Sequence, residues 1–495
     1  MPGKYILSID QGTTGTTVLL IDKKINICAK VNNEFKQYYP QPGWVEHDPE
    51  EIWKITVKTI QQALKKARAK GSDIAAIGIT NQRETTVLWN RKTGNSVHPA
   101  IVWQDRRTAN YCTQLKKQGH LATVRKKTGL VLDPYFSGTK INWILKNVPK
   151  AKKLAKDHEL AFGTIDSFLV YQLTNHETHV TDVTNASRTL LMNLKTLKWD
   201  QELLKIFKVP PSILPEIKSC SEVYGLTQNV PGLPDGIPIS GMAGDQQAAL
   251  FGQACFAEGE AKCTYGTGSF LLMNIGSKPV LSKSGLLTTV AWQVGKQVCY
   301  AFEGSSFIAG AAVQWLRDEL KFVKKASDIE KLASKVADNG GVYFVPALAG
   351  LGAPYWDPEA RGLLCGLTRG SNQSHVARAV LEGIAFSQFD ILQAMQKDSR
   401  KKLKRLKVDG GACENDFLMQ FQADVLGCEI VRPKVIETTA MGAGFLAGLA
   451  VGFWRDQKEI RQVFKVDQRF SVKMKPQERT SLVSGWQKAV QRALN

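Results

Sequence analysis

The spacing of apolar residues predicts alternating strands and helices in the first hundred residues. Residues 6–22 form two apolar runs around a turn rich in glycine and threonine, a pattern typical of two adjacent strands. Apolar side chains then recur at helical spacing between Glu50 and Lys70 (Trp53, Val57, Ile60, Leu64 and Ala67), which predicts an amphipathic helix. Residues 74–80 predict a strand buried on both faces, and residues 85–89 predict another. This alternation predicts a mixed α/β layer fold.

The same pattern returns in the second half of the chain. Residues 261–274 read as strand, Gly-Thr-Gly-Ser turn and strand, which resembles residues 6–22 and indicates an internal duplication. Two unrelated hairpins with similar small turn residues would also explain this likeness. A duplication would place two Gly/Thr turns facing one cleft. Residues 440–454 form the longest apolar run rich in glycine and alanine, and we interpret it as a buried helix because a membrane span needs about 20 residues.

Length and composition change this picture in three ways. At 495 residues the chain exceeds one compact core, so at least two domains are expected. With 43% apolar and 22% charged residues it has the composition of a globular protein. The N-terminus resembles no secretory signal, and the nine scattered cysteines form no Cys-x-x-Cys pair. These features predict a cytoplasmic protein with reduced thiols, without membrane insertion, zinc or disulfides.

The net charge of +20 raises the possibility of nucleic-acid binding, so the positions of the basic residues matter. The densest runs are residues 65–68, 125–127 and 401–405, and none contains interleaved aromatic residues. Such runs are typical of solvated surfaces. We therefore expect no nucleic-acid partner.

The turn after the first predicted strand is a candidate phosphate site. Glycine and hydroxyl residues allow backbone N–H groups to approach phosphate oxygens, and Asp10 at the strand end could hold Mg²⁺ through water. The turn matches neither a Walker loop nor a Rossmann fingerprint. A carboxylate that only caps the turn is the structural alternative for Asp10.

Three further segments carry candidate chemistry. Asp245 follows a predicted strand at the expected N-cap of a helix, where it could cap the helix or accept a proton during phosphoryl transfer. Arg83 and Glu84 follow the strand at residues 74–80 and could bind the hydroxyls of a polyol, or form a surface ion pair. Residues 408–415 contain a Gly-Gly turn that could lie against a nucleotide, although Gly-Gly alone is a weak signal.

Taken together, these residues resemble the FGGY carbohydrate kinases. Residues 135–147 and 362–382 fit the two family signatures, and the strings PGWVEHDPEEIW, ITNQRETT, DPYFSGTK, GDQQAALFGQ and GLGAPYWDP make the likeness specific from about residue 5 to residue 490. The resemblance implies two actin-like, ribonuclease-H-like ATPase domains, at residues 1–251 and 252–495, with the nucleotide and substrate cleft between them. It also implies ATP-dependent phosphorylation of glycerol to sn-glycerol 3-phosphate, the first step of glycerol catabolism, in a homo-oligomer that is a dimer or a tetramer.

The resemblance also implies roles for individual positions. Asp245 matches the catalytic base and Asp10 the acid on the Mg²⁺ side. The positions that match polyol binding are Arg83, Glu84, Tyr135, Asp245 and Gln246, together with the aromatic residues Trp103 and Phe270. The positions that match ATP binding are Thr13, Thr14, Gly15, Thr267, Gly310, Gln314, Gly411 and Asn415.

The chain departs from the family pattern at two places. Gly15 stands at a serine position of the first turn and Thr17 at an arginine position, so either phosphate affinity is lower or another basic residue substitutes. Residues 228–236 lack the arginine and histidine that some members use for control by fructose 1,6-bisphosphate and by phosphorylation, so we expect neither control. A catalytically weak polyol sensor, and a kinase for another small polyol or a pentulose, are the alternative functions.

Overall fold

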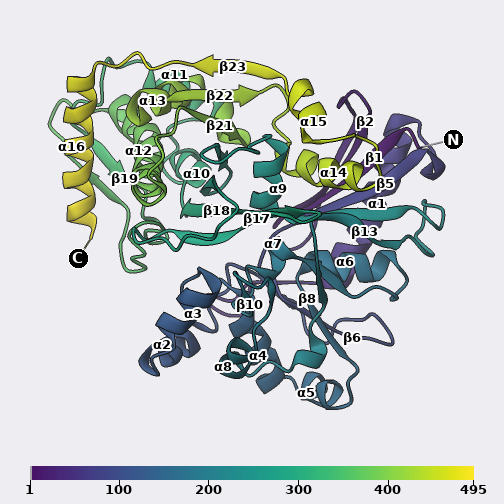
Figure 1. The fold of residues 1–495 in the computed structure, drawn as a ribbon. Coiled ribbons are helices and arrows are strands. Elements are labelled where there is room, and N and C mark those ends of the chain that lie inside the picture. Colours follow the sequence, from purple (N-terminus) through teal and green to yellow (C-terminus); the bar gives the residue numbers. More distant parts are fainter. Residues whose placement is uncertain (1–2, 495) are drawn as a thin grey trace.

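The computed structural model describes residues 3–494 and arranges most strands in one 13-stranded sheet (Figure 1). In spatial order the strands are β23 (Val466–Phe470), β22 (Glu429–Pro433), β21 (Arg405–Asp409), β15 (Ala261–Tyr265), β16 (Ser269–Gly276), β18 (Gln297–Ser306), β17 (Leu287–Val294), β13 (Ser221–Leu226), β14 (Pro238–Gly244), β5 (Ile74–Asn81), β1 (Tyr5–Gln11), β2 (Gly15–Asp22) and β3 (Ile27–Glu34).

The two halves of this sheet repeat one topology. In the first half, β1, β2 and β3 are antiparallel neighbours, β5 is parallel to β1, and β14 is parallel to β5. In the second half, β15, β16 and β18 are antiparallel neighbours, β21 is parallel to β15, and β22 is parallel to β21. The duplication inferred from the two Gly/Thr turns is therefore confirmed by strand order and direction. Strand β13 joins the halves because it pairs with both β14 and β17.

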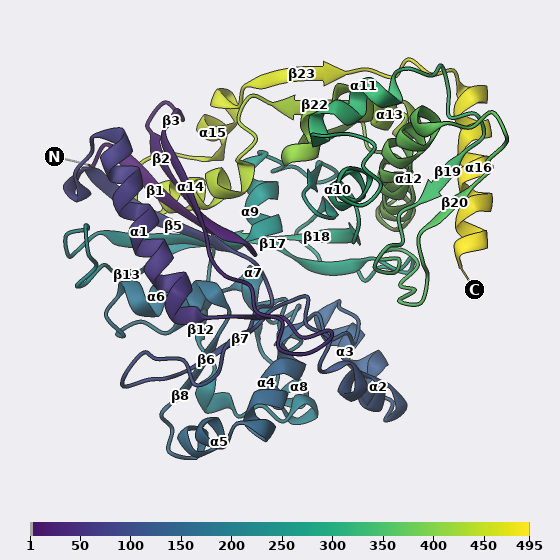
Figure 2. The same cartoon turned by 180° about the vertical axis from the view of Figure 1, so that it is seen from behind.

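Helices cover the sheet, and a large insertion follows β5. The principal helices are α1 (Pro49–Ala67), α9 (Asp245–Gly252), α10 (Gly310–Asp318), α11 (Ile329–Ala333), α12 (Gln373–Ser399), α13 (Asp416–Leu426), α14 (Thr438–Ala450), α15 (Gln457–Val463) and α16 (Pro476–Ala493). Figure 2 shows α1 running along the outer strands of the first half, against β2 and β3. The helix expected between residues 50 and 70 is therefore confirmed.

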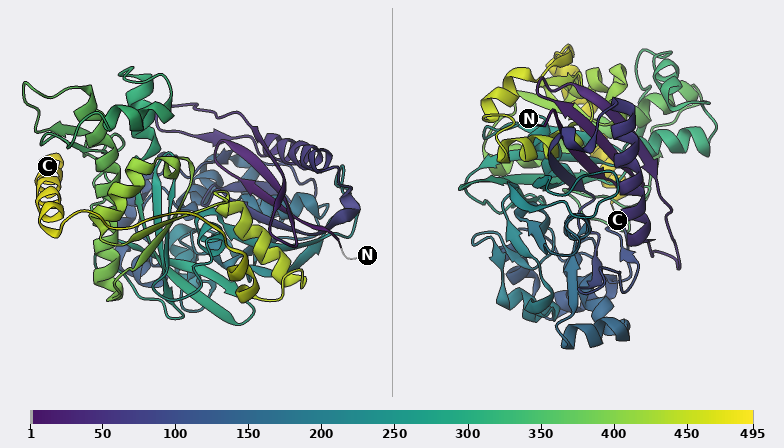
Figure 3. Two further views of the ribbon diagram at one scale, coloured as in Figure 1. Left: turned by 90° about the horizontal axis from the view of Figure 1, so that it is seen from above. Right: turned by 90° about the vertical axis from the view of Figure 1, so that its right-hand side faces the viewer.

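The insertion contains short helices and two-stranded sheets, and Figure 3 shows it projecting to one side of the large sheet. Its helices are α2 (Ala109–Lys117), α3 (Leu121–Thr128), α4 (Ser137–Asn147), α5 (Pro149–Lys156), α6 (Ile165–Leu173), α7 (Val183–Ala186) and α8 (Gln201–Phe207). Its small sheets pair β6 (Val87–Asn90) with β8 (Leu160–Gly163), β9 (Val180–Asp182) with β12 (Glu216–Lys218), and β10 (Met192–Asn193) with β11 (Lys198–Trp199). Strand β7 (Ala100–Ile101) of the insertion pairs with β4 (Glu46–His47), which precedes β5, and β19 (Tyr343–Val345) pairs with β20 (Leu363–Cys365) outside the insertion. The strand expected at residues 85–89 is thus β6, which lies outside the large sheet.

The buried face of α1 is rotated from the expected one. Ile52, Thr56, Thr59 and Ile60 are buried, whereas Trp53 is only half-buried. The hydroxyls of Thr56 and Thr59 donate to the carbonyls of Ile52 and Ile55 one turn earlier, at 2.8 and 2.6 Å. A threonine whose hydroxyl is satisfied within its own helix can face the core, which an apolar count does not register.

Helix α14 lies unusually close to its neighbours. A Cβ at Gly442 would lie 1.9 Å from the carbonyl oxygen of Ala248 in α9, and one at Gly252 would lie 2.0 Å from that of Thr438. A Cβ at Gly78 of β5 would similarly lie 2.2 Å from the carbonyl oxygen of Ala443. The apolar run at residues 440–454 is therefore a buried helix, as expected, and its glycines allow backbone-to-backbone packing.

All nine cysteines are free thiols, in agreement with the sequence-based expectation. Within residues 3–494, no helix has the length and apolar character that a membrane crossing requires. In the basic run at residues 401–405 every Lys and Arg side chain is exposed, while Leu403 is buried.

Candidate active site

The candidate residues of the first half converge because three parallel strands end at one edge of the sheet. Asp10 lies at the carboxyl end of β1, Arg83 follows β5 by two residues, and Asp245 follows β14 directly. Parallel strands bring their carboxyl ends to the same edge, where open α/β sheets bind ligands. The structure therefore places these three segments side by side at one edge of the sheet.

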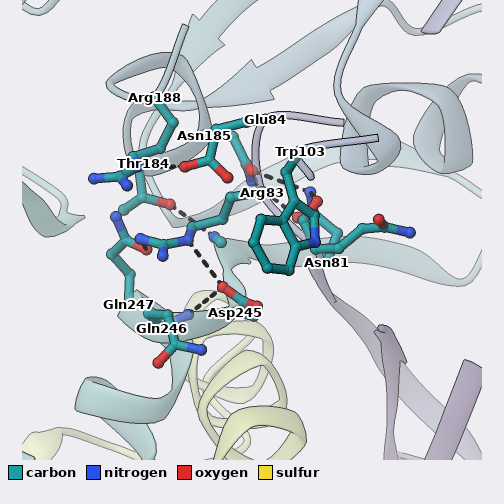
Figure 4. A network of polar contacts seen from close by, with 12 residues as sticks. Asn81, Arg83, Glu84, Trp103, Thr184, Asn185, Arg188, Asp245, Gln246 and Gln247 are labelled. Carbon is teal, nitrogen blue, oxygen red and sulfur yellow. Dashed lines mark hydrogen bonds and ion pairs between the residues drawn. The ribbon is translucent and has the colours of Figure 1, made fainter. Parts of the chain in front are cut away.

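Arg83 is at the centre of this site, and its guanidinium is 2% exposed. Its Nε lies 2.9 Å from Oδ1 of Asp245, with which it forms an ion pair. Its Nη1 donates to Glu303 at 2.5 Å and to Gln247 at 3.3 Å, and its Nη2 donates to Glu303 and to the Tyr135 hydroxyl at 3.1 and 3.4 Å. Both Nη atoms therefore have hydrogen-bond acceptors. Figure 4 shows the Arg83 side chain between Asp245 and Arg188.

A buried network stands in place of the surface ion pair that was the alternative interpretation of Arg83 and Glu84. Glu84 accepts from Nε of Arg188 at 2.6 Å, and Arg188 also donates to Glu303 at 2.9 Å. Burial raises the pKa of Glu84, with Arg188 and Arg83 opposing that effect. The surface ion-pair interpretation is wrong, because both residues are almost fully buried. Glu84 also has a φ of 61°, an uncommon conformation for a residue with a Cβ, which often marks functional sites.

Aromatic side chains surround Arg83. The rings of Trp103 and Tyr135 meet edge to face with centroids 5.6 Å apart, and the Arg83 guanidinium lies 5.9 Å from the Phe270 ring centroid. The Trp103 indole also donates to Oγ1 of Thr13 at 2.9 Å. The three predicted aromatic residues thus lie around Arg83 and Asp245, and Trp103 connects them to the first turn.

Asp245 is the first residue of α9 rather than its N-cap, which is Gly244. The expected N-cap position is therefore off by one residue. Oδ1 of Asp245 accepts a hydrogen bond from the backbone N–H of Gln246 at 2.7 Å and forms an ion pair with Nε of Arg83 at 2.9 Å. This leaves Oδ2 free to face a ligand. The Gln246 side chain accepts a hydrogen bond from Lys262, which also donates to Thr264 at 2.7 Å.

Asp10 lies close enough to Asp245 for their charges to interact. Burial, and secondly repulsion from Asp245, raise the pKa of Asp10 to about 7. In the described part of the chain, no hydrogen bond from the turn reaches the Asp10 carboxylate, so the turn-capping alternative is not supported. Two neighbouring carboxylates that repel each other are suited to a cation between or beside them.

The first turn lies directly after Asp10. Thr13 is half-buried, Thr14 is exposed, and the N–H of Gly12 donates to the carbonyl of Gly15 at 2.9 Å. A Cβ at Gly15 would lie 2.8 Å from the carbonyl oxygen of Asn33. Glycine at the family's serine position therefore matches the close approach of β3.

A buried histidine supports this turn through two glutamines. His47 contacts Gln37 at 2.5 Å and Gln82 at 3.3 Å, and these amides donate to the carbonyls of Thr13 and Gly12 at 2.9 and 3.2 Å. Because Gln82 donates to Nδ1, the network selects the neutral tautomer with its proton on Nε2. Burial lowers the pKa of His47 to about 4.

We expect His47 to make the protein sensitive to acid. Its folded pKa lies below the ordinary value of about 6.5, so the unfolded chain binds the proton more readily and stability is lost as pH falls from about 6.5 to about 4. Between pH 7.5 and pH 5, the free energy of unfolding measured in urea should fall by about 2 kcal/mol less in His47→Gln than in the unsubstituted protein. Equal losses in the two proteins would contradict this prediction.

The second Gly/Thr turn, at residues 266–268 between β15 and β16, contacts the start of α10. The N–H of Gly310 donates to the carbonyl of Gly266 at 3.0 Å, and the N–H of Ala309 donates to that of Thr267 at 2.8 Å. A Cβ at Gly310 would lie 2.6 Å from the Gly266 oxygen. Thr267 is exposed, and so is Gln314, one helical turn after Gly310.

The Gly-Gly turn at residues 410–411, which follows β21, lies beside the second Gly/Thr turn. A Cβ at Gly410 would lie 2.3 Å from the carbonyl oxygen of Tyr265, so the chain passes directly beside the second turn. Gly411 is exposed with open space around it, and Asn415 caps α13 by accepting from the N–H of Leu418 at 2.8 Å. Thr267, Gly310 and Gly411 are thus brought together, while Asn415 also has a structural role.

Sequence reasoning missed the charged residues behind the site, namely Arg188, Glu303 and Lys262. Each is at or near 0% exposed. Glu303 is a single acid within the largely apolar strand β18, and Lys262 is a single base within β15. A lone charge within a buried strand is the signal that could have identified them, since such charges require partners.

Comparisons with known proteins agree with this architecture. The models of the FGGY family of carbohydrate kinases match residues 5–252 for the N-terminal domain and residues 261–451 for the C-terminal domain. A glycerol kinase of Petrotoga mobilis is 57% identical over 493 residues, covering 99% of each chain. The crystal structure of Plasmodium falciparum glycerol kinase with ADP superposes with a TM-score of 0.92 at 40% identity, covering 100% of this chain and 99% of that one. The crystal structure of a ligand-bound xylulose kinase from Lactobacillus acidophilus superposes with a TM-score of 0.87 at 27% identity, covering 99% of this chain and 97% of that one.

Proposed function

The chain belongs to the FGGY family of carbohydrate kinases, and from this membership we infer that it transfers a phosphoryl group from ATP to glycerol. The full-length identity to glycerol kinases carries this inference. The site agrees with it, because a buried guanidinium, a carboxylate with one free oxygen and three aromatic rings suit a short polyol.

We propose that Asp245 is the general base. Its Oδ1 is occupied by Arg83 and by its own helix, so Oδ2 accepts the proton of the attacking primary hydroxyl. Arg83, Glu84, Tyr135 and Gln246 bind the hydroxyls, and Trp103 and Phe270 enclose the carbon chain and exclude water. The product is sn-glycerol 3-phosphate.

Thr13, Thr14 and Gly15 then bind phosphate oxygens from the first half of the sheet, and Thr267 binds them from the second. Gly310, Gln314, Gly411 and Asn415 bind the nucleoside. Asp10 would hold Mg²⁺, which usually binds proteins through one or two carboxylates and water and would neutralise phosphate charge. Among the described residues no cluster of three or more acids, histidines or cysteines could hold a metal, so an ion that arrives with ATP fits this donor set better than a resident one.

We propose four further properties of the protein. The division at residues 251 and 252, a cytoplasmic location, a homo-oligomeric state and the absence of control by fructose 1,6-bisphosphate or phosphohistidine rest on the sequence resemblance. A weak polyol sensor and a kinase for a pentulose are the competing functions. The identity to xylulose kinase is much lower than that to glycerol kinases, which favours glycerol.

Release of ADP from MgATP tests this proposal directly. We expect turnover with glycerol, and a kcat/KM for erythritol, xylulose and ribulose lower by at least about a hundredfold, because a longer polyol clashes with the aromatic enclosure. Tight glycerol binding without turnover would favour the sensor. A higher kcat/KM for a pentulose than for glycerol would favour the pentulose kinase.

A substitution at Thr17 tests whether the arginine that family members have at this position would strengthen phosphate binding. Thr17 lies opposite Asp10 in the β1–β2 pair, so a side chain here shares its face of the sheet. We expect Thr17→Arg to lower the KM for MgATP about tenfold, since a charge-assisted hydrogen bond to phosphate contributes about 1.5–3 kcal/mol. Thr17→Ser serves as the control. An unchanged KM would mean that another cation, for which Lys262 is the candidate, already substitutes.

A further inference from the structure

Glu303 connects the two halves of the sheet within the active site. It lies in β18 of the second half and is 0% exposed, and among the described residues its carboxylate accepts side-chain hydrogen bonds from two arginines of the first half. Arg83 reaches it with both Nη atoms, and Arg188 reaches it with Nη2. Burial opposes ionisation of Glu303, but Arg188 and Arg83 outweigh that effect and lower its pKa to about 2.

The position of Glu303 sets the orientation of the Arg83 guanidinium. A guanidinium is planar and rigid, so a carboxylate that holds both Nη atoms also sets the direction of Nε. In this structure Nε lies 2.9 Å from Oδ1 of Asp245 and forms an ion pair with it.

Glu303 also controls a repulsion between two cations. Arg83 and Arg188 lie close enough for each charge to disfavour the other, and Glu303 is the acid that both contact. Arg188 in turn binds Glu84, a proposed polyol ligand. Without the Glu303 charge, Arg83 would retain its ion pair with Asp245 and Arg188 its ion pair with Glu84, but the two guanidinium groups would lose the acid that both contact and would reorient.

We propose that Glu303 is a positioning residue that orients Arg83 and Arg188, and through them Asp245 and Glu84, so that the polyol site is assembled only when both halves of the sheet are in contact. This inference rests on the proposed function, because it concerns the same glycerol site. Glu303 itself contacts arginines rather than the reacting atoms.

Kinetics of Glu303→Gln test this proposal. Glutamine keeps the size of the side chain but removes its charge and one acceptor. We expect the KM for glycerol to rise and kcat to fall, each by about tenfold or more, with the KM for MgATP changed less than about twofold. Glu303→Asp keeps the charge and should recover part of both losses.

Glu382→Gln is the matched control. Glu382 is also a nearly buried acid, paired with Arg378 at 2.7 Å within α12, and it contacts none of the proposed site residues. We expect its substitution to lower the thermal midpoint but leave both KM values unchanged. If Glu303→Gln fails to fold, the same selective rise in glycerol KM is required of Glu303→Asp.

Three results would overturn the proposal. One is a folded Glu303→Gln protein with unchanged glycerol kinetics, another is an equal rise in both KM values, and the third is a glycerol KM effect of the same size in Glu382→Gln. Glycerol-dependent turnover of the unsubstituted protein is measured first. Its absence would instead contradict the proposed function.

Discussion

Replacement of Asp245 by asparagine is expected to lower kcat for glycerol by about 10²- to 10⁴-fold, the range typical of removing a general base. Asparagine can keep both contacts of Oδ1, those from Arg83 Nε at 2.9 Å and from the N–H of Gln246 at 2.7 Å. Only the free oxygen is replaced, by the amide NH₂ group, which accepts no proton from a hydroxyl. Position is therefore retained while basicity is lost.

Glycerol binding should survive this substitution. We expect the thermal stabilisation by glycerol to change little in Asp245→Asn, because Arg83 keeps its buried acceptors Glu303 and Gln247. Asp157→Asn, at an exposed position after α5, is the control and should keep full turnover. More than about a tenth of the normal kcat in Asp245→Asn would assign the proton to another group.

Replacement of Gly442 by alanine is expected to destabilise the protein by about 3 kcal/mol or more, near the upper end for overpacking. The added Cβ would lie 1.9 Å from the carbonyl oxygen and 2.6 Å from the carbonyl carbon of Ala248, and both are backbone atoms that no rotamer change can move. Helices α9 and α14 would have to separate.

The same change should also reduce turnover. Asp245 is the first residue of α9, so displacement of this helix moves the proposed base relative to Arg83. Thermal unfolding and glycerol-dependent ADP release measure the two effects. Gly370→Ala is the control, because a Cβ there meets only Thr368 Oγ1 at 3.8 Å on an exposed loop. Equal thermal midpoints for the two variants would contradict the proposed packing.

Much of the architecture could be predicted from local patterns. The strands around the first turn, the buried strand β5 and the second strand-turn-strand unit followed from residue periodicity, since side chains alternate along strands and recur every 3.6 residues in helices. The likeness of the two turns also predicted the duplicated sheet. Short-range rules sufficed because each of these elements is formed by contiguous residues.

The sequence also located the carboxyl ends of β1, β5 and β14, and therefore Asp10, Arg83 and Asp245. It did not determine the partners of these charges. Glu84 pairs with Arg188 over 104 residues, and Arg83 pairs with Glu303 over 220 residues. Ion pairs across such separations leave no periodic signal. They depend on which strands become neighbours and on how completely water is excluded, and only the tertiary structure decides both.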